Sequence, residues 1–206
     1  MDGVNMSSNS TSNTSTYHHG NLRQELIAAA LLLLDDEGIE GVGVRQIARK
    51  VGVAHSAPAN HFKNKRALFT ALATEIFRDL LKSLKTRCQR RPTLRESIHD
   101  FCEAMLAFGL QYPNRYMVMW RRDCSDSNDP ELNAAMEAVY QELLAILSAQ
   151  VKQKEVDLES QAIALWSLIH GYTSLRLDGN LSSGQDSVAG ISRSSAIIEV
   201  MLDGLI

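Results

Sequence analysis

Apolar positions along this chain recur every three or four residues, which is the spacing of amphipathic helices. A first segment, residues 22–37, ends before Gly38, a residue that suits a helix end. Its apolar stripe consists of Leu22, Leu26, Ala29, Ala30 and Leu33. A second, longer segment follows Asn64, a suitable N-cap. Its stripe consists of Leu68, Leu72, Ile76, Leu80 and Leu84. The pattern predicts two helices with a more polar stretch between them.

Helical spacing continues towards the C-terminus, and no segment alternates as a strand would. Residues 94–109 share an apolar face, Pro113 opens a short segment, and Asp129 with Pro130 begins a long one. Residues 161–179 and 192–206 are apolar on more than one face. We therefore expect an all-α fold of about nine helices.

The stretch between the first two stripes has the spacing of a helix-turn-helix. It reads GVRQIARKVGVAHSAPANHF over residues 43–62. Gly43 would cap a short helix that buries Ile47 and Ala48, and Gly52 would form the turn. A second helix is expected over residues 54–62, with Pro58 in its first turn.

The outward side of this second helix would be short and polar, so that it could reach base edges in a major groove. The outward residues are His55, Ser56, Ala59 and Asn60. Acidic residues are absent from Gly41 to Thr74, and the basic ones there are Arg45, Arg49, Lys50, Lys63, Lys65 and Arg66. Such a surface suits DNA phosphates, although a solvated basic hairpin would show the same charges.

Charge is distributed unevenly over the chain. The formal net charge is −3, yet residues 17–74 hold seven Lys and Arg against five acidic residues. A basic end on an acidic remainder suits a protein that touches DNA at one end only. The polar tail, residues 1–16, has too little to bury and is expected to be disordered. With no apolar run long enough for a membrane span and no signal peptide, we expect a cytoplasmic protein.

Three runs between Asn21 and Leu72, namely AAALLLL, VRQIARKVGV and HFKNKRALF, resemble the DNA-binding domain of the TetR/AcrR family. The W-x-x-x-H-G pattern at Trp166, and the run YPNRYMVMW from Tyr112, resemble a C-terminal domain of that family often called WHG. The sequence departs from the family at Ala54, where Ser or Thr is usual, and at Ala59, where an aromatic residue is usual. Ser56 could cap the second helix instead, and the lost phosphate contact would shift to neighbouring side chains.

The resemblance implies a DNA-binding domain over residues 17–66 and an effector-binding and dimerisation domain over residues 67–206, in which residues 67–91 form a connecting helix. It also implies a repressor that is released from a palindromic operator by a small molecule. The two C-terminal helices, about residues 161–179 and 192–206, would form a homodimer interface. The DNA-binding candidates are Arg23, Arg45, Gln46, His55, Ser56, Asn60, His61, Lys63 and Lys65.

Aromatic and thioether side chains concentrate in the middle of the second domain, where they could line a pocket for an apolar or aromatic ligand. The candidates are Met105, Phe108, Tyr112, Tyr116, Met119, Trp120, Trp166 and His170. Such residues also fill helical cores, and His170 alone suits a hydrogen-bonded core position.

Two alternatives remain open beside the ligand-released repressor. Cys88 lies next to Arg87, Arg90 and Arg91, whose charges could lower its pKa and make it a redox sensor. A protein that coats DNA without sequence preference is the other. The three cysteines form no C-x-x-C pair, and adjacent His18 and His19 lack further ligands, so no metal or cofactor is expected. No phosphate loop or nucleophile motif indicates an enzyme.

Overall fold

The computed structural model describes residues 22–88, 93–149, 157–185, 187–188 and 190–205. In these ranges the chain forms α-helices and one 3₁₀ helix, and the only β-type pairing is an isolated bridge between Gln185 and Ser192. The prediction of an all-α fold of about nine helices is confirmed. The predicted disordered tail and the proposed cap at Asn21 lie outside the described residues.

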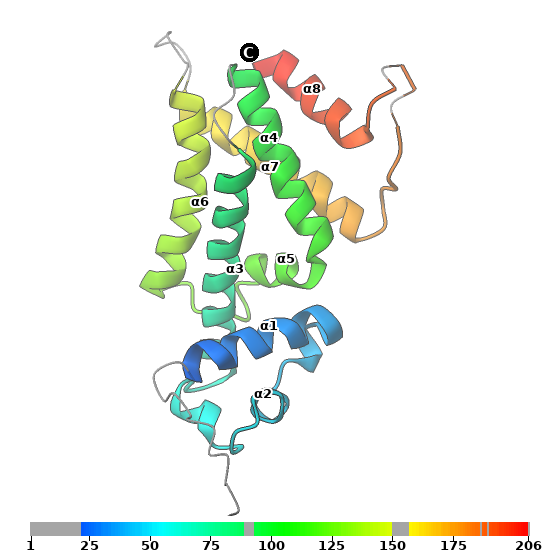
Figure 1. The fold of residues 1–206 in the computed structure, drawn as a ribbon. Coiled ribbons are helices and arrows are strands. Elements are labelled where there is room, and N and C mark those ends of the chain that lie inside the picture. The colour runs from blue at the N-terminus through cyan, green and yellow to red at the C-terminus, as the bar shows by residue number, and fades with distance from the viewer. Residues whose placement is uncertain (1–21, 89–92, 150–156, 186, 189, 206) are drawn as a thin grey trace, which may run out of the picture.

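Figure 1 shows the N-terminal helices grouped at one end of a taller helical bundle. In chain order the elements are α1 (Leu22–Gly41), α2 (Val44–Val51), the 3₁₀ helix η1 (Ala57–Asn60), α3 (Lys65–Arg87), α4 (Leu94–Gln111), α5 (Pro113–Trp120), α6 (Pro130–Ser148), α7 (Leu158–Leu177) and α8 (Arg193–Leu205). We call residues 22–66 the head and residues 67–205 the body. The head contains α1, α2 and η1, and the body holds the rest of the helices.

The hydrophobic core extends into the head, because α1 is apolar on the sides that face its neighbours, and it is continuous with the core of the body. Leu26, Ala30 and Leu34 are fully buried, and Ile47 from α2 is fully buried beside them. Gly38 breaks the regular helix with φ 73°, in the left-handed region that glycine adopts at little cost. The predicted helix stop is therefore found, and one further helical turn follows it.

Helix α3 is the element that head and body share. Asn64 caps it, since its side chain accepts a hydrogen bond of 2.8 Å from the Ala67 N–H. The helix begins in the head and then packs against α4, α5 and α6, while α1 also touches α5. Two routes therefore join head and body: the continuous helix α3 and the α1–α5 contact (Figure 1).

Close helix packing in the body depends on a glycine at the end of α4. A Cβ atom on Gly109 would lie 2.5 Å from Cγ2 of Thr173 on α7 and 3.1 Å from the Tyr116 ring on α5. Real Cβ contacts are not that short, so α4, α7 and α5 could not approach this closely with a larger residue there. The N-terminus of α4 is fixed by a capping box between Thr93 and Glu96.

Candidate functional site

Helix α2 presents basic side chains on the side opposite its buried face. Gly43 caps it in an extended conformation, and Gly52 ends it with φ 78° while its N–H bonds to the Ala48 carbonyl. Both predicted glycine roles are found. Ile47 is fully buried, whereas Arg45 and Arg49, one helical turn apart, are exposed. The geometry leaves both guanidinium groups free to meet an external partner.

The prediction of an α-helix over residues 54–62 is wrong about the type of helix. The structure forms turns and the short 3₁₀ helix η1, in which the Ala59 N–H bonds to the Ser56 carbonyl and the His61 N–H to the Pro58 carbonyl. Pro58 has no N–H to offer a regular α-helical ladder, and the hydrogen bonds run over three residues instead. The Phe62 N–H alone bonds four residues back, to Pro58.

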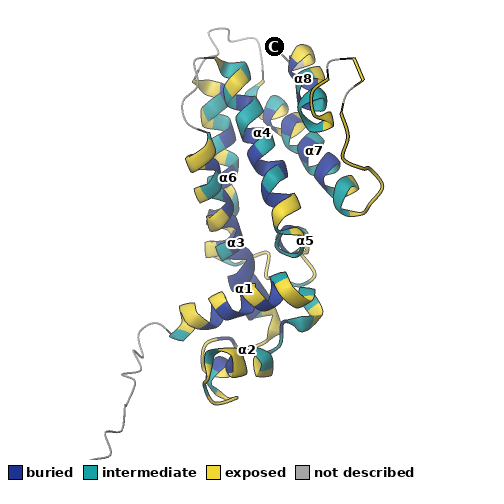
Figure 2. Ribbon diagram, turned by 45° about the vertical axis from the view of Figure 1, so that its right-hand side comes forward, coloured by how far each residue is buried: buried dark blue, intermediate teal, exposed yellow. Residues whose placement is uncertain are grey.

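The faces of this stretch nevertheless follow the prediction. Pro58 and Phe62 are buried inside the head. His55, Ser56, Ala59 and Asn60 are all exposed, and Figure 2 shows exposed ribbon at this end of the molecule, near α2. The proposed cap by Ser56 is wrong, because its side chain makes no capping hydrogen bond and the backbone N–H of Ala57 bonds to Ala54 instead. The hydroxyl therefore has no capping role.

The loop after η1 and the start of α3 bring further basic side chains to the same end of the molecule. Lys63, Lys65 and Arg66 are all exposed. The Lys65 ammonium lies 5.5 Å from the centre of the Phe69 ring, and Arg66 donates a hydrogen bond of 3.4 Å to the Asp123 carbonyl. Arg66 therefore contacts the body, while the two lysines remain on the head surface.

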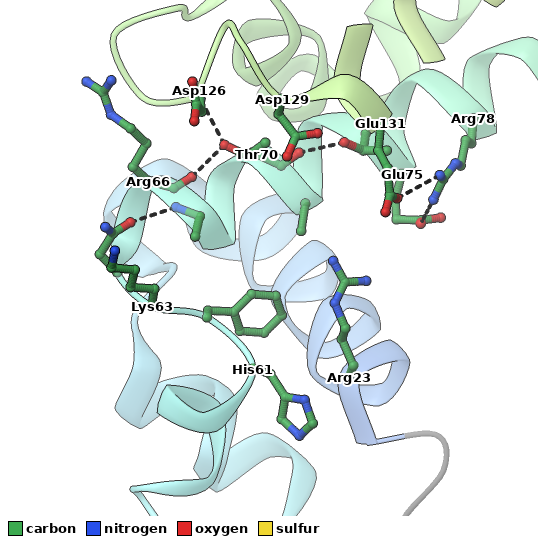
Figure 3. A pocket seen from close by; sticks show the side chains of 15 residues that line it. Arg23, His61, Lys63, Arg66, Thr70, Glu75, Arg78, Asp126, Asp129 and Glu131 are labelled. Carbon is green, nitrogen blue, oxygen red and sulfur yellow. Dashed lines mark hydrogen bonds and ion pairs between the residues drawn. The ribbon is translucent and has the colours of Figure 1, made fainter. Parts of the chain in front are cut away.

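Arg23 and His61 line a hollow of about 350 Å³ between head and body, which we call the waist hollow (Figure 3). The Arg23 guanidinium lies 5.7 Å from the centre of the Phe62 ring. Four carboxylates, of Glu75, Asp126, Asp129 and Glu131, and the cations Lys63, Arg66 and Arg78 also line it. Arg78 forms ion pairs with Glu75 and Glu131, so the charges of the hollow are mixed and partly matched.

Most of the head's cations have no acidic partner. Among the residues that the structure describes, Arg23, Arg45, Arg49, Lys63 and Lys65 form no ion pair. Lys50 lies 3.9 Å from Asp36, both of them largely exposed. Unpaired, solvated cations lose little when they meet phosphates, so this surface suits a polyanion.

Gln46 is the DNA candidate whose position fits least directly. It is half-buried, and a Cβ on Gly43 would lie 2.4 Å from its Oε1, which shows that the amide folds back over the helix start. Contact with DNA would require a different Gln46 rotamer.

The sequence pattern does not single out Arg115, although this residue lies in the run YPNRYMVMW. It is bound to Asp35 of the head and to Asp79 of α3.

The aromatic candidates of the body form a connected cluster. Trp120 lies at its centre, with ring centroids 5.9 Å from Tyr116, 5.9 Å from Trp166 and 4.7 Å from His170. Phe108 and Tyr112 form a second pair, 5.4 Å apart. Met105 is buried in the core between helices. The rings largely fill the space that they surround.

The eight ligand candidates do not line a single cavity in the described part of the chain. Phe108 and Tyr112 line a cleft of about 380 Å³, and Trp120 with Trp166 lines another of about 330 Å³. Met119 and Trp120 border a hollow of about 40 Å³, little more than room for a water molecule. Five of the candidates thus border three separate depressions, and Met105, Tyr116 and His170 border none of these three.

His170 and Tyr116 form a polar contact within this cluster. The Tyr116 hydroxyl lies 2.7 Å from His170 Nδ1, and the rings stack. Burial lowers the pKa of His170, while burial raises the pKa of Tyr116 to about 12 despite opposing contacts with Thr173 and Trp120. Trp120 Nε1 is buried and makes no well-formed hydrogen bond with the described residues. His170 is therefore a hydrogen-bonded histidine at the edge of the core.

The structure contradicts the expected activation of Cys88. The half-buried thiol has its pKa raised to about 11, because burial and the nearby carboxylates of Asp100 and Glu142 outweigh the charge of Arg87. Its other basic neighbours in sequence, Arg90 and Arg91, lie outside the described residues. A thiol with a raised pKa is a poor nucleophile at neutral pH, so the proposal of Cys88 as a redox sensor is not supported.

Helices α7 and α8 each combine a buried face with exposed apolar residues. On α7, Leu165 and Ile169 are buried, whereas Ile163 is 57% and Leu175 is 44% exposed. On α8, Val200 is 74% exposed.

Over the described ranges, no helix is both long and apolar enough to cross a membrane, and no group of three or more potential ligands is placed to hold a metal ion.

Known families match both ends of the chain. Residues 26–72 match the family of bacterial regulatory proteins called tetR, and residues 98–196 match the tetracycline repressor-like C-terminal domain. Together the two matches cover more than two thirds of the sequence. The class D tetracycline repressor protein of Escherichia coli is 48% identical over 54 residues, which are 26% of this chain and 25% of that protein.

Solved structures show the same fold. A protein of unknown function from Rhodococcus sp. RHA1 superposes with a TM-score of 0.75 at 26% identity, over 92% of this chain and 96% of that one. The transcriptional regulator FadR from Bacillus subtilis, solved in complex with stearoyl-CoA, superposes with a TM-score of 0.67 at 19% identity, over 88% and 98%. The fold, the helix-turn-helix and both family matches agree, and the chain belongs to the TetR family of bacterial transcriptional regulators.

Proposed function

We propose that this regulator is a homodimeric repressor that binds a palindromic operator through its head and leaves it when a small molecule binds the body. One observation supports operator binding above all others: exposed, unpaired cations surround a short polar surface on η1. In this arrangement the cations would position the protein on phosphates, and Ser56 and Asn60 would meet base edges. The 3₁₀ geometry keeps both side chains outward.

The residues proposed to contact DNA fall into two groups with different roles. Short side chains on and beside η1 are proposed for the bases: His55, Ser56 and Asn60. Longer or flanking side chains are proposed for phosphates: Arg23, Arg45, Gln46, His61, Lys63 and Lys65. Because phosphate contacts are insensitive to sequence and base contacts are not, the two groups predict different consequences of substitution.

Dimerisation is proposed through the outward faces of α7 and α8. Ile163, Leu175 and Val200 are apolar and exposed. Apolar side chains at the surface do not stabilise a monomer, whereas they would be buried at a dimer interface. A two-fold axis at these helices would place two heads on one duplex, and successive half-sites of a helix-turn-helix dimer lie about 34–36 Å apart. The palindrome follows from that symmetry.

Release by a small molecule is proposed to act through the two routes that join head and body. FadR, which shares the fold, was solved with stearoyl-CoA, and this supports a ligand site in the helical body. A ligand that binds better to a body whose two heads are wrongly spaced would lower DNA affinity by its differential affinity for the two states. The proposed division remains residues 17–66 for DNA and 67–206 for effector and dimer contacts.

The test is selection of bound fragments from random duplex DNA by the full-length protein, with the enriched fragments sequenced. A palindrome of two half-sites is the expected result. A single unpaired half-site would contradict the dimer. Absence of any enriched sequence, together with binding that disappears as salt is added, would instead support the alternative of a protein that coats DNA without sequence preference.

A further inference from the structure

A cleft on the body differs in character from the other depressions. It lies between α3, α4 and α5 and has a volume of about 380 Å³, within the range of about 300–1,000 Å³ typical of small-molecule sites. The side chains that give it its chemistry are Asp79, Lys82, Arg87, Phe108, Tyr112 and Arg115. We call it the α3–α5 cleft. Three of these residues are cations and one is an acid.

Two of the three cations form no close ion pair in the described ranges, although the charge of Lys82 also acts on Asp79. Lys82 and Arg87 are exposed on α3 and form no ion pair with any residue in the described ranges. Asp79, the one acid of the cleft, pairs with Arg115 at 3.2 Å. Its charge is therefore already matched, and the cleft as a whole presents an excess of positive charge that suits an anion.

The opposite side of the cleft is aromatic. The Phe108 and Tyr112 rings lie 5.4 Å apart at an angle of 55°, and the Arg115 guanidinium lies 4.7 Å from the centre of the Tyr112 ring. A flat apolar group could pack against these rings while an acidic group on the same molecule met Lys82 and Arg87. A bare inorganic anion would use only half of this surface.

Arg115 connects the cleft to the head. Its Nε and Nη2 donate to the two carboxylate oxygens of Asp35 on α1 at 2.8 and 2.6 Å, and its Nη1 donates to Asp79 on α3. Asn114 adds a bond of 3.4 Å to the Asp35 carbonyl. The Arg115 side chain is only 13% exposed. This one guanidinium thus joins α1, α3 and α5 at the edge of the cleft.

We propose that the α3–α5 cleft binds a small aromatic acid, a carboxylate or a phosphate monoester on a flat apolar body, and that the bound anion draws Arg115 away from Asp35. The acid would be held by Lys82 and Arg87 and its ring by Phe108 and Tyr112. Loss of the Arg115–Asp35 pair would loosen the end of α1 from α5. Coupling to the operator rests on the proposed function, whereas binding in the cleft does not.

The first test measures binding by calorimetry to the full-length protein, with 2-naphthoate, 2-naphthyl phosphate and the neutral 2-naphthalenemethanol as probes. Both acids should bind at least tenfold more tightly than the alcohol, and their ratio identifies the preferred acidic group. The double variant Lys82→Gln/Arg87→Gln should weaken the acids at least tenfold. Lys85→Gln, an exposed lysine on the same helix outside the cleft, is the matched control and should change nothing. Equal affinity of wild type and double variant for 2-naphthoate would overturn the site.

The second test follows hydrogen exchange of backbone amides around Asp35 with and without 2-naphthoate. Faster exchange over residues 34–41 on binding, and the same fast exchange in Asp35→Asn without ligand, are expected from the loss of the Arg115 pair. Unchanged exchange with ligand bound would contradict the proposed link. Neither measurement uses DNA, so both can succeed if no operator exists, and both can fail while operator binding stands.

Discussion

Four arginines of the body are used in the opposite way to those of the head. In the body, Arg78, Arg95, Arg115 and Arg121 each form ion pairs with carboxylates at 2.5–3.2 Å, and these partners raise the arginine pKa values further. In the head, Arg23, Arg45 and Arg49 make no such pair with any described residue. Three of these arginines join separate helices: Arg78 joins α3 to α6, Arg95 joins α4 to α8, and Arg115 joins α5 to both α1 and α3.

This difference indicates what each set of charges is for. A paired arginine fixes the relative positions of two helices and has little left to offer a ligand. An unpaired one contributes almost nothing to folding and keeps its charge for an outside partner. Removing one of these four paired arginines should therefore affect stability, whereas removing an arginine of the head should affect DNA binding.

The largest effect should come from Arg115→Met, which leaves Asp35 and Asp79 without their shared cation. Breaking a buried pair by removing one partner costs about 3–5 kcal/mol, and we expect about 2–3 kcal/mol here because both carboxylates keep some contact with water. Urea unfolding measures the loss. Arg45→Met is the matched control and should leave the urea midpoint where it is. Equal midpoints for the two variants would remove the basis of the comparison.

Asn60→Ala should change the sequence preference of the head. Loss of one good base contact costs about 1–3 kcal/mol on the matching base pair and almost nothing on random DNA. Fluorescence anisotropy with the selected operator and with a scrambled duplex gives both affinities. A base-reading role for Asn60 requires the loss on the operator to exceed the loss on the scrambled duplex.

Lys65→Ala should weaken binding to every duplex by a similar factor. Removal of one phosphate contact lowers the slope of log affinity against log salt by about 0.9. Titrations at several salt concentrations on operator and scrambled DNA measure this slope. A loss confined to the operator would show that Lys65 contacts bases and not phosphates.

Acid should destabilise the body through His170 by a smaller amount. Burial lowers its pKa in the folded protein below the ordinary value of 6.5, so the unfolded chain binds the proton more readily. Stability is then complete above pH 6.5 and declines as the pH falls below that value. His170→Gln should flatten the pH dependence of the urea midpoint between pH 7 and 5, and an unaltered dependence would show that other groups cause it.

The smallest effect is expected at Cys88. With the thiol pKa raised to about 11, little thiolate exists at neutral pH. The rate of alkylation by iodoacetamide should still be rising at pH 9, and mild peroxide should leave DNA affinity unchanged. A rate that levels off below pH 8 would restore this cysteine as a candidate sensor.

The sequence predicted the helices well because their signals are local. Gly43, Gly52, Asn64 and Asp129 cap or end helices where expected, since each role depends on one residue and its immediate neighbours. The error over residues 54–62 has a local cause too. Pro58 has no N–H, and the hydrogen bonds of Ala59 and His61 run over three residues, while the Phe62 N–H alone reaches four residues back.

The body's sites could not be predicted in the same way, because they depend on distances between helices far apart in sequence. Aromatic residues in a helix predict an apolar surface but not whether neighbouring rings fill it, and Trp120 is surrounded by four other rings. Arg115 looked like an ordinary charged residue until Asp35, eighty positions earlier, was placed against it. Cys88 was misjudged because neighbours in sequence suggested a basic setting, whereas Asp100 and Glu142 face it in space.

The salt dependence of duplex DNA affinity shows whether the head binds DNA, when it is measured for two variants that lose the same charge. The head variant carries Arg45→Gln, Arg49→Gln and Lys65→Gln, and the body variant carries Lys82→Gln, Lys85→Gln and Arg87→Gln near the far end of α3. The head variant should lose about one unit of slope for each phosphate contact removed, and the body variant should match wild type. Equal losses in both would show that DNA responds to the overall charge of the protein, and the head would no longer be its binding surface.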